Sequence, residues 1–144
     1  MTQEEKQLLL TDLCARLPYG IIVHTWYNEC IDIKCIGIDL YTNAINLDIP
    51  NDDDAKVYID NVKPYLRPMS SMTEEEYYEF RKISGLRKDG EYFSNHLPEW
   101  GNSIITERVM VRTIDWLNSH YFDYRGLIPM GLALEAPEDM YKTE

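Results

Sequence analysis

The residues best suited to chemistry lie in the stretch "DWLNSHYFDYRGLI", which runs from Asp115 to Ile128. His120, Asp123 and Arg125 could act there as a base, a carboxylate and an anion-binding group, as in many acid–base or binding sites. The same residue types also end helices, because imidazoles bond terminal carbonyls and carboxylates cap the amides of a following turn. At helical spacing Asp115 and His120 point in different directions, so they are not expected to form a catalytic pair. Arg125 can pair with Asp123 or with Asp115. We expect a structural helix end, and a binding role for His120, Asp123 and Arg125 is the alternative.

The remaining histidines follow no catalytic or metal-binding pattern. His24, His96 and His120 are scattered, no HxH or HExxH arrangement occurs, and the sequence has no glycine-rich phosphate loop. His24 alternates with Ile22 and Trp26 along a predicted strand, where a hydrogen-bonded interior histidine is the expected role. The sequence therefore predicts no metal and no cofactor. An enzyme is kept as the alternative in which dispersed His and Asp residues assemble a site.

The cysteines indicate reduced thiols. Cys14, Cys30 and Cys35 are odd in number and show no CxxC spacing, so neither a disulfide framework nor a cysteine zinc site is expected. Cys14 falls on the apolar side of a predicted helix and is interpreted as a small core residue. The N-terminus does not resemble a secretory signal, and no segment holds the roughly 20 apolar residues of a membrane span. We expect a cytoplasmic protein.

A stretch of irregular sequence, "LRKDGEYFSNHLPEWGNS", runs from Leu86 to Ser103 and is rich in aromatic residues. Such a pattern predicts a loop that is held down by its own aromatic side chains. Loops of this kind often carry binding sites. The candidate binding residues in this stretch are Tyr92, Phe93, His96 and Trp100.

The charge of the chain restricts its partners. The formal net charge is -11, from 25 acidic and 14 basic residues. Such a field repels phosphate backbones and anionic membranes, so we expect neither direct nucleic-acid binding nor membrane binding. One alternative uses the charge directly: an acidic DNA mimic that inhibits a nucleic-acid-binding protein.

The first half of the chain is predicted to be a helix followed by short strands. Thr2 and Glu5 form a capping box that begins the helix, and Pro18 ends it. From residue 20 onward, β-branched and aromatic residues alternate in short runs, which turns such as "NDDD" separate. A slip in the alternation of "CIDIKCIGIDLYTN" indicates a bulge near Lys34 or Cys35, or a kink at the following glycine.

These runs predict an antiparallel meander of about four short strands that forms a small, partly closed barrel. Pro64 and Pro68 cannot donate ladder hydrogen bonds and are expected to mark the exit from the sheet.

The second half of the chain is predicted to be mostly helical. Thr73 and Glu76 form a second capping box, and Met72 and Tyr77 are placed as a hydrophobic staple. A longer helix is expected over residues 105–121. Its predicted inner side is formed by Ile105, Val109, Met110, Thr113, Ile114, Trp116, Leu117, His120 and Tyr121.

The complete prediction is a single α+β domain over residues 1–144, with a strand-rich half of about 1–68 and a helix-rich half of about 69–144. The helix-rich half is expected to hold two or three helices and a short C-terminal strand at "GLALEAP".

Three blocks of sequence resemble a known family. "LPYGIIVH", "VKPYLRPMSSMTEEE" (62–76) and "DWLNSHYFDYRGLIPMGLALEAPEDMY" (115–141) are similar to blocks in small proteins encoded in gut-bacterial prophages and mobile elements. The resemblance covers roughly half of the chain. It implies a phage or mobile-DNA setting and implies no reaction.

The function that these observations favour is a non-catalytic protein-interaction or accessory role with a protein partner. Eleven tyrosines and three tryptophans exceed what a core of this size requires, and such amphipathic rings suit protein contacts. The DNA mimic and the enzyme are the alternatives.

Overall fold

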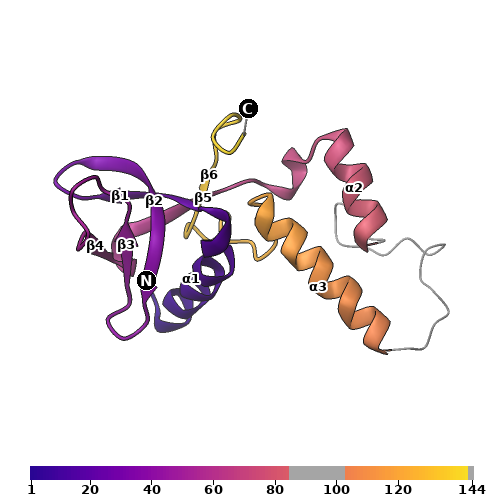
Figure 1. Cartoon of the computed structure of the whole chain (residues 1–144), viewed down its shortest axis with the longest axis horizontal. Coiled ribbons are helices and arrows are strands. Elements are labelled where there is room, and N and C mark those ends of the chain that lie inside the picture. The colour runs from indigo at the N-terminus through magenta and orange to yellow at the C-terminus, as the bar shows by residue number, and fades with distance from the viewer. Residues whose placement is uncertain (85–102, 143–144) are drawn as a thin grey trace. The chain divides into compact units, whose positions relative to one another are not determined.

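The computed structural model describes residues 1–84 and 103–142 and has an α+β fold (Figure 1). The chain divides into two compact units, one made of residues 1–66 with 125–144 and the other of residues 67–124. We call them the sheet unit and the helical unit and describe each by itself. The expectation that the whole chain forms a single domain stays a prediction.

The sheet unit begins with helix α1, Gln3–Arg16. Its predicted capping box is present: the Glu5 amide donates to the Thr2 hydroxyl at 3.1 Å, and the Thr2 amide donates to the Glu5 carboxylate at 3.2 Å. A 3-10 turn, Leu17–Tyr19, follows. Pro18 lies in this turn, since a proline cannot continue the hydrogen bonding of an α-helix.

The buried side of α1 differs from the predicted one. Leu9, Leu10 and Leu13 are buried, but Cys14 is exposed, so its expected core role is wrong. Asp12 and Arg16 occupy the buried side instead, and Arg16 Nε and Nη2 donate to the Asp12 carboxylate at 2.8 and 3.2 Å. The sequence does not distinguish a charged residue that is buried in an ion pair from one that is exposed to water, so the buried side of α1 was predicted incorrectly.

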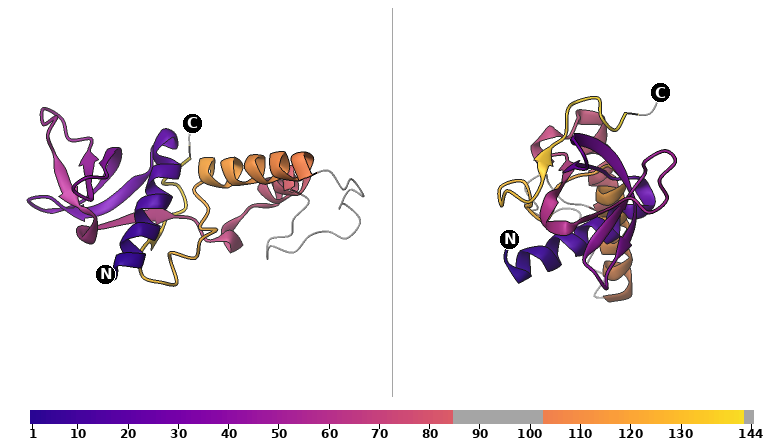
Figure 2. Two further views of the ribbon diagram at one scale, coloured as in Figure 1. Left: turned by 90° about the horizontal axis from the view of Figure 1, so that it is seen from below. Right: turned by 90° about the vertical axis from the view of Figure 1, so that its left-hand side faces the viewer.

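Six strands form one open sheet in the order β4-β3-β2-β1-β5-β6. Figure 2 gives two further views of the ribbon. The four pairings among β1 to β5 are antiparallel, and β6 is parallel to β5. The predicted meander is therefore present, but the expected partly closed barrel is not formed, because β4 and β6 are left as the two edges. The strands are β1 Ile22–Trp26, β2 Cys30–Asp39, β3 Ala44–Leu47, β4 Lys56–Tyr58, β5 Val62–Leu66 and β6 Leu134–Glu135.

Strand β2 changes partner along its length, in the region where the sequence predicts a bulge. Residues 30–34 pair with β1 and residues 35–39 with β3, and the register shifts between Cys35 and Gly37. A Cβ atom at Gly37 would lie 2.6 Å from Asn46 Nδ2. A side chain at position 37 would have to displace the Asn46 amide, and glycine lets β2 bend here without that shift.

Of the two prolines predicted to mark the exit from the sheet, Pro68 follows the end of β5, whereas Pro64 lies inside the strand, so the prediction for Pro64 is wrong. Pro64 pairs with Val23 of β1. On the other side of β5, pairing with β6 involves only Tyr65 and Leu66, so the missing N–H of Pro64 does not interrupt that ladder. The expected C-terminal strand within "GLALEAP" is confirmed as β6.

The hydrophobic core of the sheet unit joins α1 to the inward side of the strands. The leucines of α1 are buried together with alternate residues of the strands, as expected for a sheet with one covered face. The strand residues and their neighbours in this core are Ile21, Val23, Cys35, Ile45, Leu47, Val57, Ile59, Val62 and Leu66.

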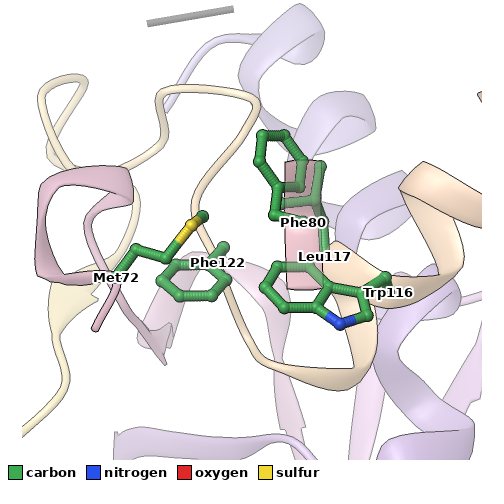
Figure 3. Close-up of a cluster of buried hydrophobic side chains, with 5 residues drawn as sticks. All are labelled: Met72, Phe80, Trp116, Leu117 and Phe122. Carbon is green, nitrogen blue, oxygen red and sulfur yellow. The ribbon is translucent and has the colours of Figure 1, made fainter. Parts of the chain in front are cut away.

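The helical unit contains a 3-10 turn, Met69–Ser71, and two helices, α2 (Glu74–Ser84) and α3 (Ser103–Ser119). The second predicted capping box is confirmed, with the Glu76 amide donating to the Thr73 hydroxyl at 3.1 Å. The two helices pack around one buried cluster (Figure 3), which consists of Met72, Phe80, Trp116, Leu117 and Phe122.

The predicted inner side of α3 is correct only in part. Thr113, Trp116 and Leu117 are buried, whereas Met110 is 54% and Ile114 38% exposed. The helical wheel placed all five residues on one half of the helix. The side of α3 that is buried is narrower than this half, so Met110 and Ile114 lie outside it. No helix in the described residues combines the length and apolar character that a membrane span requires.

Candidate functional site

The candidate site lies on the outward side of the sheet unit, where β1, β2 and β5 run side by side. Val23 and Thr25 of β1 are buried, so His24 and Trp26 point away from the core. The interpretation of His24 as an interior residue is therefore wrong, because its side chain is 40% exposed. The prediction placed His24 on the inward face because its neighbours on that side of the strand, Ile22 and Trp26, are apolar. The inward face is instead formed by Val23 and by Thr25, whose hydroxyl donates to the Asn61 carbonyl.

Three side chains from three strands form a hydrogen-bonded group. His24 pairs directly with Asp32 in the β1–β2 register, and His24 Nδ1 lies 2.7 Å from Asp32 Oδ1. The Tyr65 hydroxyl of β5 donates to the same oxygen at 2.8 Å. The Tyr65 ring also meets the imidazole edge to face, with the two centroids 6.3 Å apart. The imidazole is thus oriented from two neighbouring strands.

The electrostatics of this group follow from the shared carboxylate oxygen. Partial burial acts to raise the pKa of Asp32, but the hydrogen bonds from His24 and Tyr65 outweigh it, and the pKa of Asp32 falls below its ordinary value. Burial and the hydrogen bond to Asp32 raise the pKa of Tyr65 to about 12. Asp32 is therefore a carboxylate and Tyr65 a neutral phenol at neutral pH.

A shallow hollow of about 250 Å³ adjoins this group. Trp26, which is 63% exposed, stands at its margin, and Cys30, paired with Trp26 across the β1–β2 ladder, is exposed there as well. The lining residues are His24, Thr25, Trp26, Cys30, Asp60, Asn61 and Lys63. The arrangement combines an exposed indole, a thiol, an imidazole oriented by a carboxylate, and a lysine.

Two kinds of chemistry are open to these groups. The exposed indole and the polar groups around it can hold a side chain of a binding partner. The imidazole, with Nδ1 hydrogen-bonded to Asp32, can use Nε2 as a base toward a bound molecule. No cluster of three or more metal-ligating side chains occurs in residues 1–84 and 103–142.

The structure places His120 at the end of α3, within the helical unit. His120 Nδ1 lies 2.8 Å from the Trp116 carbonyl oxygen, and the imidazole stacks on the Trp116 ring with the centroids 4.1 Å apart. Tyr121 has a left-handed φ of 63°, and the Phe122 amide donates to the Leu117 carbonyl at 3.0 Å. These contacts make a helix-ending motif in which the carbonyls of Trp116, Leu117 and Asn118 accept hydrogen bonds from the residues that follow.

Asp123 and Arg125 belong to different units, Asp123 to the helical unit and Arg125 to the sheet unit. The Asp123 amide donates to the Arg67 carbonyl at 2.8 Å, and the side chain is buried. Arg125 belongs to the sheet unit, where Arg125 Nε donates to Asp12 at 3.1 Å. Arg125 thereby contributes to the charge pairing of the buried Asp12 carboxylate.

The other candidate binding residues, Tyr92, Phe93, His96 and Trp100, lie outside the described residues. Sequence reasoning missed Asp32, Tyr65, Cys30 and Lys63. The signal was present in β2, where Cys30, Asp32 and Lys34 alternate with isoleucines and so share one outward face. Their meeting with His24 could not be read from the sequence, because it depends on strand register.

Comparisons with known proteins found no relative of the chain: no family model, no curated protein and no solved structure matches it. The resemblance to proteins of prophages and mobile elements stays a prediction.

Proposed function

We propose that the chain is a non-catalytic protein-interaction module, an accessory factor of phage or mobile-element origin, that binds a partner protein at the hollow beside Trp26. The observation that carries this proposal is the 63% exposure of Trp26 at the margin of a preformed hollow. Large aromatic side chains that cover such hollows are typical of the residues that dominate protein interfaces.

The exposure of Trp26 supports binding because it leaves a large apolar surface in water. Burial of that surface by a partner yields about 25 cal/mol for each Å² of apolar area removed from water. An indole also loses little conformational freedom when it is covered, since it has only two side-chain torsions.

The hollow is suited to one protein side chain. Its volume of about 250 Å³ lies below the range of about 300–1,000 Å³ that is common for small-molecule pockets. The exposed lining is mostly apolar, and Lys63 supplies a positive charge beside it. The occupant that fits this chemistry is an apolar side chain of a partner segment, with a neighbouring carboxylate that reaches Lys63.

The hydrogen-bonded group beside the hollow supports the same role. His24, Asp32 and Tyr65 tie three adjacent strands together on the outward side. A surface that is ordered before binding loses less conformational entropy when the partner arrives. The group therefore provides a rigid frame for contacts made by Trp26 and Lys63.

Affinity capture from the host tests this proposal with a matched pair of variants. The wild type, Trp26→Ala and Tyr58→Ala are used as baits, and the retained proteins are identified by mass spectrometry. Tyr58 is the control, because it is 64% exposed on the same sheet unit but does not line the hollow. We expect a protein that the wild type and Tyr58→Ala retain and that Trp26→Ala loses by at least about tenfold, as hot-spot truncations do.

A second bait, Lys63→Ala, tests the carboxylate contact and should weaken retention less than Trp26→Ala. The interaction should also survive increased salt in large part, since apolar burial is not screened. Retention by all variants alike would contradict the proposal. Capture of a basic nucleic-acid-binding protein that salt releases and Trp26→Ala leaves intact would favour the DNA mimic instead.

A further inference from the structure

We propose that helix α3 is a self-association surface, against which a second copy of this chain packs its own α3 in the antiparallel direction. The proposal concerns the helical unit and does not depend on the protein-binding role of the hollow. Its central residues are three exposed apolar side chains, Met110, Val111 and Ile114, which we call the α3 stripe. Two exposed charged residues, Arg108 and Asp115, border the stripe.

The α3 stripe leaves apolar surface in water, outside the side of α3 that faces the buried cluster. Met110, Val111 and Ile114 are 54%, 59% and 38% exposed, whereas Trp116 and Leu117 of the same helix belong to the cluster. With 3.6 residues per turn, Ile114 lies between Met110 and Val111 around the helix axis, so the three side chains form one continuous strip. Contact with another helix would remove this strip from water.

Two opposite charges lie on one flank of the α3 stripe. Asp115 and then Arg108 follow Val111 around the helix axis. Both side chains are exposed, and no hydrogen bond or ion pair engages either of them among the residues whose side chains the structure describes. They are seven residues apart, which is about 10 Å along the helix, so they cannot pair with each other on one helix. The flank therefore offers one positive and one negative group to a second molecule.

An antiparallel pair of copies brings these charges together. A twofold axis gives every contact twice, because a residue i that meets residue j of the second copy implies that j meets i. Positions 108 and 115 are equally far from a point between residues 111 and 112, so an axis there sets Arg108 level with Asp115 of the second copy. Antiparallel helices related in this way turn the same flank toward each other. Two Arg–Asp pairs therefore form, one on each side of the axis.

The same axis makes the α3 stripe meet itself. Val111 lies beside Val111 of the second copy, and Ile114 lies within about one residue of the level of the second copy's Met110. A partner helix of one charge sign would instead set a like charge against Arg108 or against Asp115. The surface is complementary to itself in both its apolar strip and its charges, which favours a second copy as the occupant.

The size of the surface indicates a weak dimer. Three apolar side chains from each copy cover far less than the roughly 800 Å² per partner of a stable interface. The net charge of -11 on each copy also opposes association. We expect the dimer to form reversibly, with a dissociation constant on the order of 0.1 mM.

Charge reversal on the flank tests the proposal, by sedimentation equilibrium of the full chain from about 10 µM to about 1 mM. Arg108→Glu leaves two negative groups on the flank, and Asp115→Arg leaves two positive ones. Each variant sets like charges opposite each other in a self-pair, so its dissociation constant should rise at least about tenfold. The double variant carries the reversed pairs at the unchanged net charge of -11, and it should dimerise as the wild type does.

A mixture of the two single variants gives the sharpest result. In a mixed pair both flank contacts join opposite charges again, because one copy supplies two negative groups and the other supplies two positive ones. Native mass spectrometry should therefore show the mixed dimer in at least about tenfold excess over either self-dimer. A variant that had lost its fold would not regain association in this way.

Two further variants separate the α3 stripe from the overall charge of the chain. Lys82→Glu makes the same change in net charge as Arg108→Glu, at an exposed position of α2, and should change the dissociation constant by less than about threefold. Val111→Ser keeps every charge but removes the apolar contact at the axis, and should weaken dimerisation at least about tenfold.

A wild type that stays monomeric up to about 1 mM would overturn the proposal. Single charge variants that dimerise as the wild type does would overturn it as well, and so would a mixture of them without the mixed dimer. Trp26→Ala should lose the captured partner and still dimerise, so this proposal and the proposed function can fail separately.

Discussion

Tyr141 shows how one hydroxyl can complete the pairing of two strands. The β1–β5 register runs up to Val23 and Pro64, and the next pair would be Ile22 with Tyr65. At that point the Ile22 amide donates to the Tyr141 hydroxyl at 3.0 Å, and the hydroxyl donates to the Tyr65 carbonyl at 2.8 Å. A side chain from the C-terminal segment thus satisfies backbone groups of two strands.

Removal of this hydroxyl should destabilise the sheet unit. In Tyr141→Phe the ring is kept, but part-buried backbone groups of Ile22 and Tyr65 lose their partner. We expect the free energy of unfolding to fall by about 1–3 kcal/mol, measured by urea denaturation. Tyr58→Phe is the control, since Tyr58 is largely exposed, and it should change stability by less than about 0.5 kcal/mol. Equal denaturation midpoints for the two variants would contradict this account of Tyr141.

At the scale of elements, the start of helix α2 is fixed by more than its capping box. Glu76 accepts from Arg67 Nη1 and Nη2 at 2.7 and 2.6 Å, and its carboxylate also accepts from the Thr73 amide at 3.0 Å. The Arg67 guanidinium lies 4.3 Å from the centroid of the Phe122 ring. One carboxylate therefore links the first turn of α2 to Arg67 and, through it, to the buried cluster.

The stability of the helical unit should depend on acid through Glu76. Burial acts to raise the pKa of Glu76, but the hydrogen bonds from Arg67 and Thr73 outweigh it and lower the pKa from 4.5 to about 2. Because the folded pKa is depressed, this stabilisation is complete above about pH 4.5 and is lost as the pH falls toward about 2. We expect Glu76→Gln to reduce stability at pH 7, and the deficit relative to wild type to shrink on acidification below about pH 4.

Urea denaturation followed by tryptophan fluorescence at several pH values checks this prediction, since Trp116 lies in the buried cluster. Glu75→Gln is the matched control, because Glu75 is exposed in the same helical turn. A deficit of Glu76→Gln that is independent of pH, or equal to that of Glu75→Gln, would show that the ion pair does not carry the effect.

At the scale of the whole molecule, the helical unit is an insertion between β5 and the C-terminal part of the sheet unit. Its two ends meet, because Arg67 and Phe122 form a parallel bridge in which the Arg67 amide donates to the Tyr121 carbonyl at 2.7 Å. A short connection can therefore replace the whole insertion without stretching the chain on either side.

We expect a variant in which residues 67–124 are replaced by a flexible linker of about six Gly and Ser residues to keep the fold of the sheet unit, since six residues span the gap with little strain. The check is a dispersed NMR spectrum together with cooperative thermal unfolding. A collapsed spectrum without a cooperative transition would contradict this prediction and favour the single domain that the sequence predicts.

Local features of this protein could be predicted from its sequence because they depend on residues a few positions apart. The capping boxes at Thr2 and Thr73 and the end of α3 each rest on hydrogen bonds or turns within one short segment. Neighbouring residues supply these interactions whatever the rest of the chain does. The sequence also determines the acidic charge and the order of helix and strands.

Only the tertiary structure decided which side of each strand faces the core and which distant residues meet. The faces of β1 could not be told apart, since Ile22 and Trp26 are as apolar as Ile21 and Val23. Pro64 can lie within β5 because β6 pairs with β5 only at Tyr65 and Leu66, so no ladder bond needs the N–H that proline lacks. His24 met Asp32 and Tyr65 through the register of three strands, and register is set by burial of a whole face rather than by any single residue.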